Sequence, residues 1–417
     1  MSTCCDMPLP GTRPMLSMDE ALARILAQAR PVAGQENVSL LDALNRVLAS
    51  AQVSAIDVPG ADNSAMDGYA LRTTDLPASG EASLPVSQRI PAGQVAQPLQ
   101  AGTAARIFTG APVPAGADTV IIQEVCREED GVVRFPVPVK AGANIRRAGE
   151  DIRKGREVLA AGTRLTPQAL GLAASVGLGS LPVFRRLQVA VLSTGDELVE
   201  PGMPLAHSGQ IYNSNRYTLI SLLRRLDCEV IDLGRVRDDY GETCAVLDRA
   251  AGQADLILST GGVSVGEEDH VKSALEARGR LDLWRIAIKP GKPLAFGQIG
   301  EAFFIGLPGN PVSSFVTFQL FVKPFIAACQ GERQTAQPAF AVAAAFDWPK
   351  PDKRREFLRA RLEPGDDGQI RVGIYPSQSS GVLSSTVWAD GLVDVAPNQV
   401  IRAGDAVTFL PFKGLLP

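Results

Sequence analysis

Histidine and cysteine, the side chains that build most transition-metal sites, are scarce in this sequence. The 417 residues include two histidines, His207 and His270, and six cysteines, no two of which have a C-x-x-C spacing. A histidine-rich metal site is therefore excluded, and no spacing suits zinc or dithiol redox chemistry. Because cytosolic proteins rarely form disulfides, we expect reduced and mostly buried thiols, with Cys4 and Cys5 as a remote candidate for a soft metal.

The sequence also lacks an excess of positive charge and any long apolar run. Its 41 basic and 45 acidic residues leave a net charge of -4, which argues against nucleic acid or an anionic membrane as a partner and favours a small molecule. No stretch approaches about 18 consecutive apolar residues. The first residues lack the basic-then-apolar order of a secretory signal, so we expect a cytoplasmic protein.

The length and composition predict several domains. With 45% hydrophobic residues the chain can bury more than one core, and its length suggests at least three domains. Composition predicts an N-terminal region of mixed α and β structure over residues 1–185, with an inserted β-rich subdomain at about 54–150. It predicts a central α/β domain over 186–330. The segment 331–417, with short alternating runs and many turns, is predicted to be a small β-barrel, with a sandwich as the alternative.

Local signals place the helices of the N-terminal region. Ser17–Glu20 reads as a capping box ahead of an Ala/Leu-rich segment that ends near Pro31. A second helix is predicted to extend over about Leu40–Ala49. Thr166 suits a helix N-cap and Pro167 the first helical position, which predicts another helix there.

In the central domain, apolar runs alternate with helical stretches. The runs are Leu187–Ser193, Glu229–Leu233 and Asp255–Ser259. The helices between them have as candidate N-caps Asn213 or Asn215, Asp238 or Asp239, and Asp269. Continuously apolar strands separated by helices are typical of a parallel sheet covered on both faces. We therefore predict a three-layer, doubly wound α/β domain, with a further apolar helix from Pro311 to about Gln330.

Ligands of such domains bind beyond the carboxyl ends of the strands, so the loops that follow the strands are the candidate site. Three loops are rich in glycine and hydroxyl groups, and glycine lets backbone N–H groups approach phosphate oxygens. Their candidate binding residues are Thr194, Gly195, Gly261, Gly262, Ser264, Pro308, Gly309, Asn310 and Ser313. One such loop can equally be a plain strand-to-helix turn, but three in one domain favour a phosphate-bearing ligand.

Charged residues accompany these loops. Glu197, Asp238 and Asp269 follow three different strands, and carboxylates collected at one sheet edge suit Mg²⁺. The alternative for Asp238 and Asp269 is a helix N-cap. Lys289 and Lys292 lie in a turn stiffened by Pro and Gly, which suits binding of an anion, although an exposed solubilising turn is possible.

Polar loops also occur in the β-rich part of the N-terminal region. The stretch 62–70 combines turn-forming residues with Asp62 and Asp67, and the stretches 108–114 and 144–151 are similar. Arg146, Arg147 and Arg153 could bind an anionic ligand or simply form a solvated basic face.

Together these stretches resemble the molybdopterin molybdenumtransferase family, which includes MoeA of bacteria and the gephyrin E domain of animals. The resemblance extends from about residue 13 to 412. It rests on seven motifs that occur in family order: SAMDGYA, TGAPVP, NIRRAGEDI, STGDEL, STGGVSVGEED, KPGKP and GLPGNPVS.

The resemblance implies that molybdate is inserted into adenylylated molybdopterin, with Mg²⁺-dependent loss of AMP. It also implies a homodimer, and other proteins of molybdenum cofactor biosynthesis are possible partners. Two groups of residues match family site positions, one in the N-terminal region and one in the α/β domain: Asp67, Thr109 and Asp151, and Glu197, Asp238, Asp269 and Lys289. Arg354 is the candidate for an arginine of the C-terminal domain.

Two departures and two alternatives accompany this resemblance. Arg285 stands where a lysine is expected, and Gln378–Gly381 differs from a Gly-Ser-His form of some relatives, so Ser379 and Ser380 are only candidate substrate contacts. A molybdopterin adenylyltransferase would share the GGVS loop and the acids but would need little beyond residues 186–330. A gephyrin-like scaffold would not need to keep the carboxylates.

Overall fold

A computed structural model describes residues 15–32, 34–262, 270–333, 338–365 and 367–412 of the chain. The chain folds into two compact units, each of which combines segments that are distant in sequence. The first unit consists of Met1–Glu36, Asn45–Ala49 and Val183–Pro417, and the second of Asn37–Leu44 and Ser50–Pro182.

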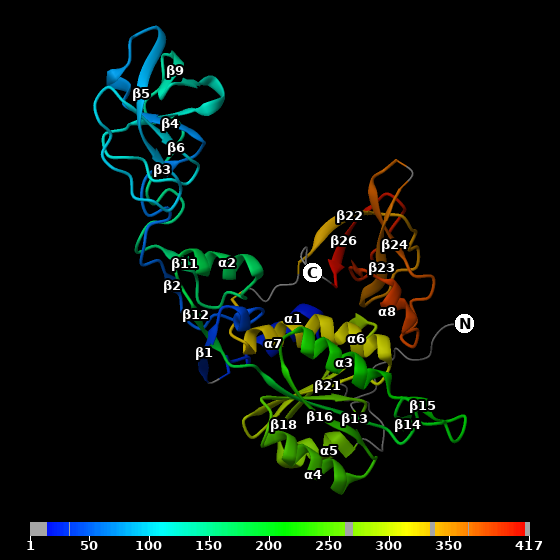
Figure 1. Ribbon diagram of the computed structural model, residues 1–417. Helices are drawn as coiled ribbons and strands as arrows, with labels where there is room; N and C mark the ends of the chain where they lie inside the picture. Colours follow the sequence, from blue (N-terminus) through cyan, green and yellow to red (C-terminus); the bar gives the residue numbers. More distant parts are fainter. Residues whose placement is uncertain (1–14, 33, 263–269, 334–337, 366, 413–417) are drawn as a thin grey trace. The chain divides into compact units, whose positions relative to one another are not determined.

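A six-stranded sheet forms the centre of the first unit (Figure 1). In spatial order its strands are β16 (Glu229–Val236), β13 (Gln188–Thr194), β17 (Leu256–Thr260), β21 (Ala302–Leu307), β20 (Pro293–Ile299) and β18 (Gly279–Arg285). The first four strands are parallel, and β20 is antiparallel to both of its neighbours. The three predicted apolar strands correspond to β13, β16 and β17.

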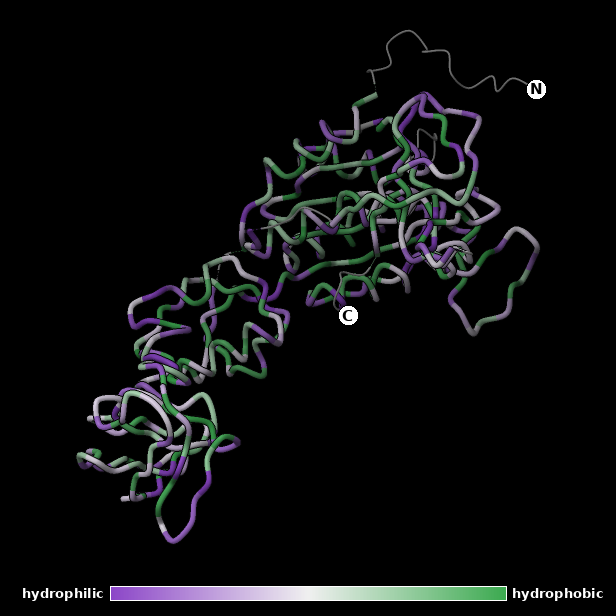
Figure 2. The backbone as a smooth tube through the Cα atoms, turned by 90° about the horizontal axis from the view of Figure 1, so that it is seen from above, coloured by the Kyte–Doolittle hydropathy of each residue, from purple (hydrophilic) through white to green (hydrophobic). Residues whose placement is uncertain are grey.

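Strand β13 explains why this sheet has helices on both faces. Its residues Val189 and Val191 belong to one hydrophobic core, and Ala190 and Leu192 belong to another. The first core is covered by α1 (Met18–Leu26), α3 (Ser214–Arg225), α6 (Pro311–Thr317) and α7 (Lys323–Cys329), and the second by α4 (Tyr240–Ala251) and α5 (His270–Arg278). Hydrophobic residues run through the interior strands (Figure 2). The predicted doubly wound, three-layer arrangement is confirmed.

The predicted helix starts are largely confirmed in this unit. Ser17 and Glu20 form the capping box of α1, with Glu20 N–H donating to Ser17 Oγ at 3.2 Å and Ser17 N–H donating to Glu20 Oε2 at 2.9 Å. Asn213, rather than Asn215, caps α3. Asp239 caps α4 by accepting from the N–H of Glu242 at 2.7 Å. Asp238 is therefore not needed as a cap.

The apolar segment after Asn310 forms one continuous helical rod. It comprises α6, a π-helical turn over Phe318–Val322, and α7. Within the described residues, Pro311–Cys329 is the one helix long and apolar enough to cross a membrane, yet 78% of its most apolar window is buried inside the protein. Packing in the first core accounts for its composition.

A small closed barrel completes the first unit. Around the barrel the strands are β23 (Arg355–Pro364), β24 (Ile370–Ile374), β22 (Phe340–Ala344), β26 (Ala406–Pro411) and β25 (Gly391–Val395), and β25 pairs back onto β23. The predicted β-barrel is thus confirmed, and the sandwich alternative is wrong. A short strand, β19 (Ile288–Lys289), lies in the connection between β18 and β20 of the central sheet and pairs with the start of β23, so the barrel is tied to that connection.

The second unit is built mainly on another six-stranded sheet. In order its strands are β7 (Thr119–Ile122), β4 (Gly68–Leu71), β6 (Ala104–Ile107), β5 (Gly80–Ile90), β9 (Val132–Val137) and β8 (Arg127–Glu129). Side chains of β4 alternate between two cores, with Tyr69 and Leu71 in one and Ala70 in the other. This sheet lies within the predicted β-rich subdomain.

The remaining elements of the second unit are short. Strand pairs are formed by β3 (Asn63–Ser64) with β10 (Ile145–Arg146) and by β2 (Gln52–Val53) with β11 (Glu157–Leu159). Helix α2 (Pro167–Ser175) is capped by Thr166 and has Pro167 at its start, as predicted. Strands β1 (Gln35–Ser39) and β12 (Ser180–Phe184) lie where the chain passes between the units.

The prediction of a helix over Leu40–Ala49 is wrong. Only a short 3₁₀ helix, Leu41–Ala43, forms there. Asn45 follows with φ of 65°, a left-handed conformation that cannot continue a right-handed helix. Apolar spacing alone did not reveal this turn.

Candidate functional site

The three glycine-bearing loops of the central domain meet at the carboxyl ends of β13, β17 and β21. A β-carbon on Gly261 would lie 2.7 Å from the carbonyl oxygen of Thr194, and one on Gly262 would lie 2.9 Å from Thr194 Oγ1. One on Gly309 would lie 3.9 Å from the α-carbon of Gly261. Glycine is therefore required at 261 and 262 because the loops pack against each other, whereas a β-carbon at 309 would make only an ordinary van der Waals contact.

Asn215 holds this junction together. Its Nδ2 donates to Thr260 Oγ1 and to the carbonyl oxygen of Gly309, both at 2.8 Å. One side chain of α3 thus connects the ends of β17 and β21. The sequence offered Asn215 only as an alternative helix cap, so this role was missed.

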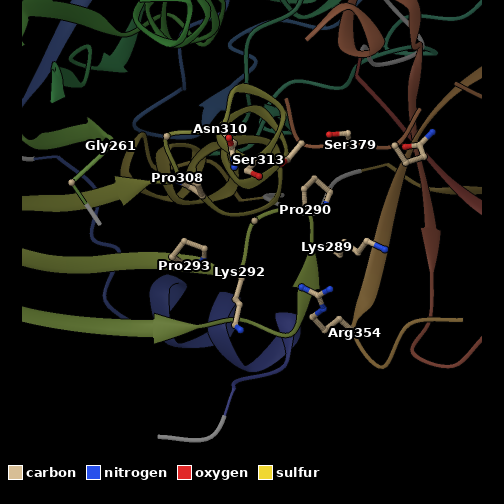
Figure 3. Close-up of a pocket in the computed structure, with 15 residues that line it drawn as sticks. Gly261, Lys289, Pro290, Lys292, Pro293, Pro308, Asn310, Ser313, Arg354 and Ser379 are labelled. Atoms are coloured by element: carbon tan, nitrogen blue, oxygen red, sulfur yellow. The ribbon is translucent and has the colours of Figure 1, made fainter. Parts of the chain in front are cut away.

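A cavity of about 600 Å³ opens beside the second and third loops and reaches the barrel (Figure 3). Most of the loop residues predicted from the second and third loops line it, together with the three predicted cations. These predicted residues are Gly261, Gly262, Pro308, Gly309, Asn310, Ser313, Lys289, Lys292 and Arg354. The candidate contacts Ser379 and Ser380 also line it, as do Gln378, Pro290, Gly291 and Pro293.

The basic side chains lie on one side of this cavity, and Asn310, Ser313 and Ser379 lie on the other (Figure 3). Lys289 Nζ is 2.8 Å from Glu356 Oε1, and the Glu356 side chain is only 2% exposed. Arg354 donates to Asp352 through Nε at 3.2 Å and Nη2 at 3.0 Å. Partial burial opposes ionisation of Asp352, but the bonds and charge of Arg354, with Lys289, hold its pKa at about 2.

Lys292 differs from these two cations. It is half-buried and lines the cavity, and it forms no ion pair with any acid in the described part of the chain. A lysine in this setting attracts an anion more strongly than one already paired with a carboxylate.

The barrel side of the cavity is held by a buried arginine that the sequence did not single out. Arg359 is fully buried, and it donates to the carbonyl oxygen of Ser379 and to Ser385 Oγ at 3.3 and 3.2 Å. Burial lowers its pKa to about 10. The N–H of Val312, in the first turn of α6, donates to the carbonyl oxygen of Ser380 at 3.0 Å. The 378–380 loop is thus fixed from both sides.

The predicted acids lie away from the cavity lining. The Glu197 carboxylate lies next to Gly195, and Asp238 Oδ2 accepts from the N–H of Asp196 at 3.2 Å. Both Glu197 and Asp238 are exposed. Asp196, which links the first loop to the loop after β16, was not anticipated.

Two predicted residues, Ser264 and Asp269, lie outside the described residues, as do Glu267 and Glu268. Over the residues that the structure does describe, no group of three histidine, cysteine or acidic side chains is close enough to hold a metal ion.

In the second unit the structure joins two of the three predicted residues. Asp67 Oδ1 accepts from both the N–H and Oγ1 of Thr109 at 2.8 Å, and these bonds lower the pKa of Asp67. Asp151 lies in a separate connection, where its N–H donates to the carbonyl oxygen of Val58 at 3.1 Å. No hydrogen bond links Asp151 to Asp67 or Thr109 within the described chain.

These features define a class of protein. A doubly wound domain whose glycine-rich loops adjoin a cavity lined by lysine, arginine and serine suits an anionic ligand such as a phosphate or another oxyanion. The closed barrel that supplies part of the lining makes this more than a single nucleotide-binding domain.

Three family models match the chain in succession. The MoeA N-terminal region (domain I and II) matches residues 16–177, the probable molybdopterin binding domain matches 190–328, and the MoeA C-terminal region (domain IV) matches 341–412. The chain belongs to the molybdopterin molybdenumtransferase (MoeA) family and is a transferase of molybdenum cofactor biosynthesis.

Individual relatives agree over nearly the full length. A molybdopterin molybdenumtransferase of Haemophilus influenzae is 45% identical over 406 residues, covering 96% of this chain and 100% of the relative. That of Synechococcus elongatus is 40% identical over 384 residues, covering 89% and 93%. The crystal structure of the molybdopterin biosynthesis moeA protein of Pyrococcus horikoshii has a TM-score of 0.82 at 30% identity, covering 96% and 100%.

Proposed function

We propose that this protein inserts molybdate into adenylylated molybdopterin and releases AMP, which yields the molybdenum cofactor. The observation that carries this proposal is the cavity between the α/β domain and the barrel, with Lys292, Lys289 and Arg354 on one side and serines on the other. The similarity of the chain, over nearly its full length, to proteins named molybdopterin molybdenumtransferase favours this activity over that of an adenylyltransferase or a scaffold.

The cavity has the chemistry needed for a tetrahedral oxyanion. Lysine and arginine offset negative charge, while Ser313 and the 378–380 loop offer hydroxyl and amide donors. Molybdate and the phosphates of an adenylylated pterin are both anions that repel each other. We propose that Lys292, which has no acidic partner among the residues that the structure describes, binds the incoming oxyanion and lowers this repulsion.

Mg²⁺ is proposed to act at the carboxyl ends of β13 and β16. Exposed carboxylates such as Glu197 and Asp238 have the hard oxygen donors that Mg²⁺ prefers, and Asp238 is free of a capping role. We also propose Asp269 as a ligand, from its place in the sequence. When bound, the ion would offset phosphate charge as AMP leaves. The side chains of the protein would hold molybdate and the pterin phosphates in position, and the reaction would require no nucleophilic side chain.

Asp67, Thr109 and Asp151 are proposed to complete the site. The hydrogen bonds from Thr109 fix the ionised Asp67 carboxylate in one orientation, which supports a role in positioning substrate or metal. We further propose that the protein is a homodimer in which these residues serve the site together with the α/β domain. A cytoplasmic location is also proposed, where other proteins of the pathway deliver the pterin. The domain boundaries at residues 185 and 330 are likewise our proposal.

The test is a reconstituted reaction with the full-length protein. Purified protein is incubated with adenylylated molybdopterin, Mg²⁺ and molybdate, and both AMP release and cofactor formation are measured. We expect equimolar AMP and cofactor that depend on molybdate. AMP release without molybdenum uptake, or neither product, would contradict the proposal.

A further inference from the structure

Two arginines lie side by side on the sheet of the second unit. β5 and β6 are parallel neighbours, and Arg89 of β5 is in register with Arg106 of β6. Tyr69 of β4 is in register with Arg106 on the other side, so the three side chains share one face of the sheet. Like charges directly opposite on neighbouring strands are unfavourable, so the fold retains a charge pair that costs stability.

Both arginines contact the aromatic ring of Phe108. The guanidinium carbons of Arg89 and Arg106 are each 4.8 Å from the ring centroid of Phe108. Phe108 directly precedes Thr109, whose N–H and hydroxyl both bind the carboxylate of Asp67. The two positive charges therefore lie beside the hydrogen-bonded pair of Asp67 and Thr109.

The other charged groups of this face already have partners. Arg106 donates to the carbonyl oxygen of Gly68 at 3.0 Å and to Gln123, and its charge contributes, after the bonds from Thr109, to the lowered pKa of Asp67. The hydroxyl of Tyr69 donates to Glu128 at 2.5 Å.

Arg89 is the exception. It is exposed, and within the described residues its guanidinium has neither a hydrogen-bond acceptor nor an acidic partner, only the ring of Phe108. A guanidinium held over an aromatic face keeps its N–H groups available to a ligand. The Arg89 guanidinium is therefore available to donate hydrogen bonds to a ligand and does not serve in a structural ion pair within the described residues.

We propose that Arg89 binds a tetrahedral oxyanion at this face of the second unit, with Phe108 orienting its guanidinium and Arg106 adding fixed positive charge. A planar guanidinium matches two oxygens of such an anion at once. The identity of the anion, either a phosphate group of the pterin substrate or molybdate itself, rests on the proposed function. The existence of an oxyanion site at Arg89 does not depend on that function.

Chemical modification of the full-length protein tests the site directly. Phenylglyoxal reacts with accessible arginines, and peptide mass spectrometry gives the rate at each residue. Inorganic pyrophosphate or molybdate is expected to slow modification of Arg89 at least several-fold but not that of Arg127, an exposed arginine of the same unit. Protection by pyrophosphate alone or by molybdate alone identifies the source, and equal rates with and without both anions overturn the proposal.

Kinetics of Arg89→Gln separate this inference from the proposed function. We expect the KM of one anionic substrate to rise about tenfold with kcat little changed, an unchanged melting temperature, and no effect in the matched variant Arg127→Gln. Normal KM values with an unprotected Arg89 would overturn the site and leave the transferase proposal intact. Protection of Arg89 in a protein that forms no cofactor would support the site and overturn the transferase proposal.

Discussion

The carboxylate of Glu197 lies directly over Gly195. A β-carbon added to Gly195 would be 2.5 Å from Glu197 Oε2 and 2.8 Å from Oε1, and Gly195 has a φ of +139°. Any other residue at position 195 would therefore displace the carboxylate and strain the backbone. The glycine determines where this negative charge lies at the end of β13.

Gly195→Ala tests the role of this contact. Because it displaces a proposed Mg²⁺ ligand, we expect the Mg²⁺ concentration for half-maximal AMP release to rise about tenfold or more. A Mg²⁺ titration of the initial rate measures this, with a melting curve to confirm folding.

Gly179→Ala is the control for that variant. Position 179 has open space around it and no positive φ, so its Mg²⁺ dependence should be that of the wild type. A wild-type Mg²⁺ requirement in Gly195→Ala would remove Glu197 from the proposed metal site.

Lys289 is expected to matter for stability as well as for binding. Lys289→Ala leaves the buried carboxylate of Glu356 with the indole N–H of Trp348, at 2.9 Å, as its remaining hydrogen bond among the described residues. The free energy of unfolding should fall by about 1–3 kcal/mol, as measured by urea denaturation. Lys350→Ala, at an exposed position of the same unit, should change it by less than about 0.5 kcal/mol; equal effects would be evidence against the buried pair.

The depressed pKa of Asp352 predicts a pH dependence. Burial opposes ionisation, but the bonds from Arg354 keep the folded-state pKa at about 2, below the ordinary value of 3.8. A lowered folded-state pKa stabilises the protein above the ordinary pKa, and this contribution is lost as pH falls toward 2. Asp352→Asn should thus be less stable than wild type at neutral pH, by on the order of 1 kcal/mol, and the difference should shrink between pH 4 and pH 2. A difference independent of pH would contradict the ion pair.

The sequence predicted those features that depend on local pattern. The continuous apolar run of β13 implied helices on both faces, since successive side chains enter different cores. Thr166, Asn213 and Ser17 marked helix starts through their own hydrogen bonds. Lys289 and Arg354 were found because turn chemistry and the family resemblance drew attention to them.

Features that depend on contacts between distant segments could not be predicted in this way. Arg359 donates a hydrogen bond to the carbonyl oxygen of Ser379, a cavity-lining residue 20 positions away in sequence. Asn215 donates to the carbonyl oxygen of Gly309, 94 positions away. The register that sets Arg89 beside Arg106 needs a strand pairing that no local pattern specifies. The failed helix at residues 40–49 has a similar cause, because the left-handed backbone of Asn45 is not visible in apolar spacing.

The most direct test of the central claim measures how cofactor formation depends on molybdate in Lys292→Ala and in Lys350→Ala. If Lys292 binds the incoming oxyanion, half-saturating molybdate should rise about tenfold in Lys292→Ala, while the melting temperature stays unchanged because Lys292 forms no ion pair in the described chain. Lys350→Ala should match the wild type. Identical molybdate dependence in all three proteins would contradict the assignment of this cavity to the transferred oxyanion.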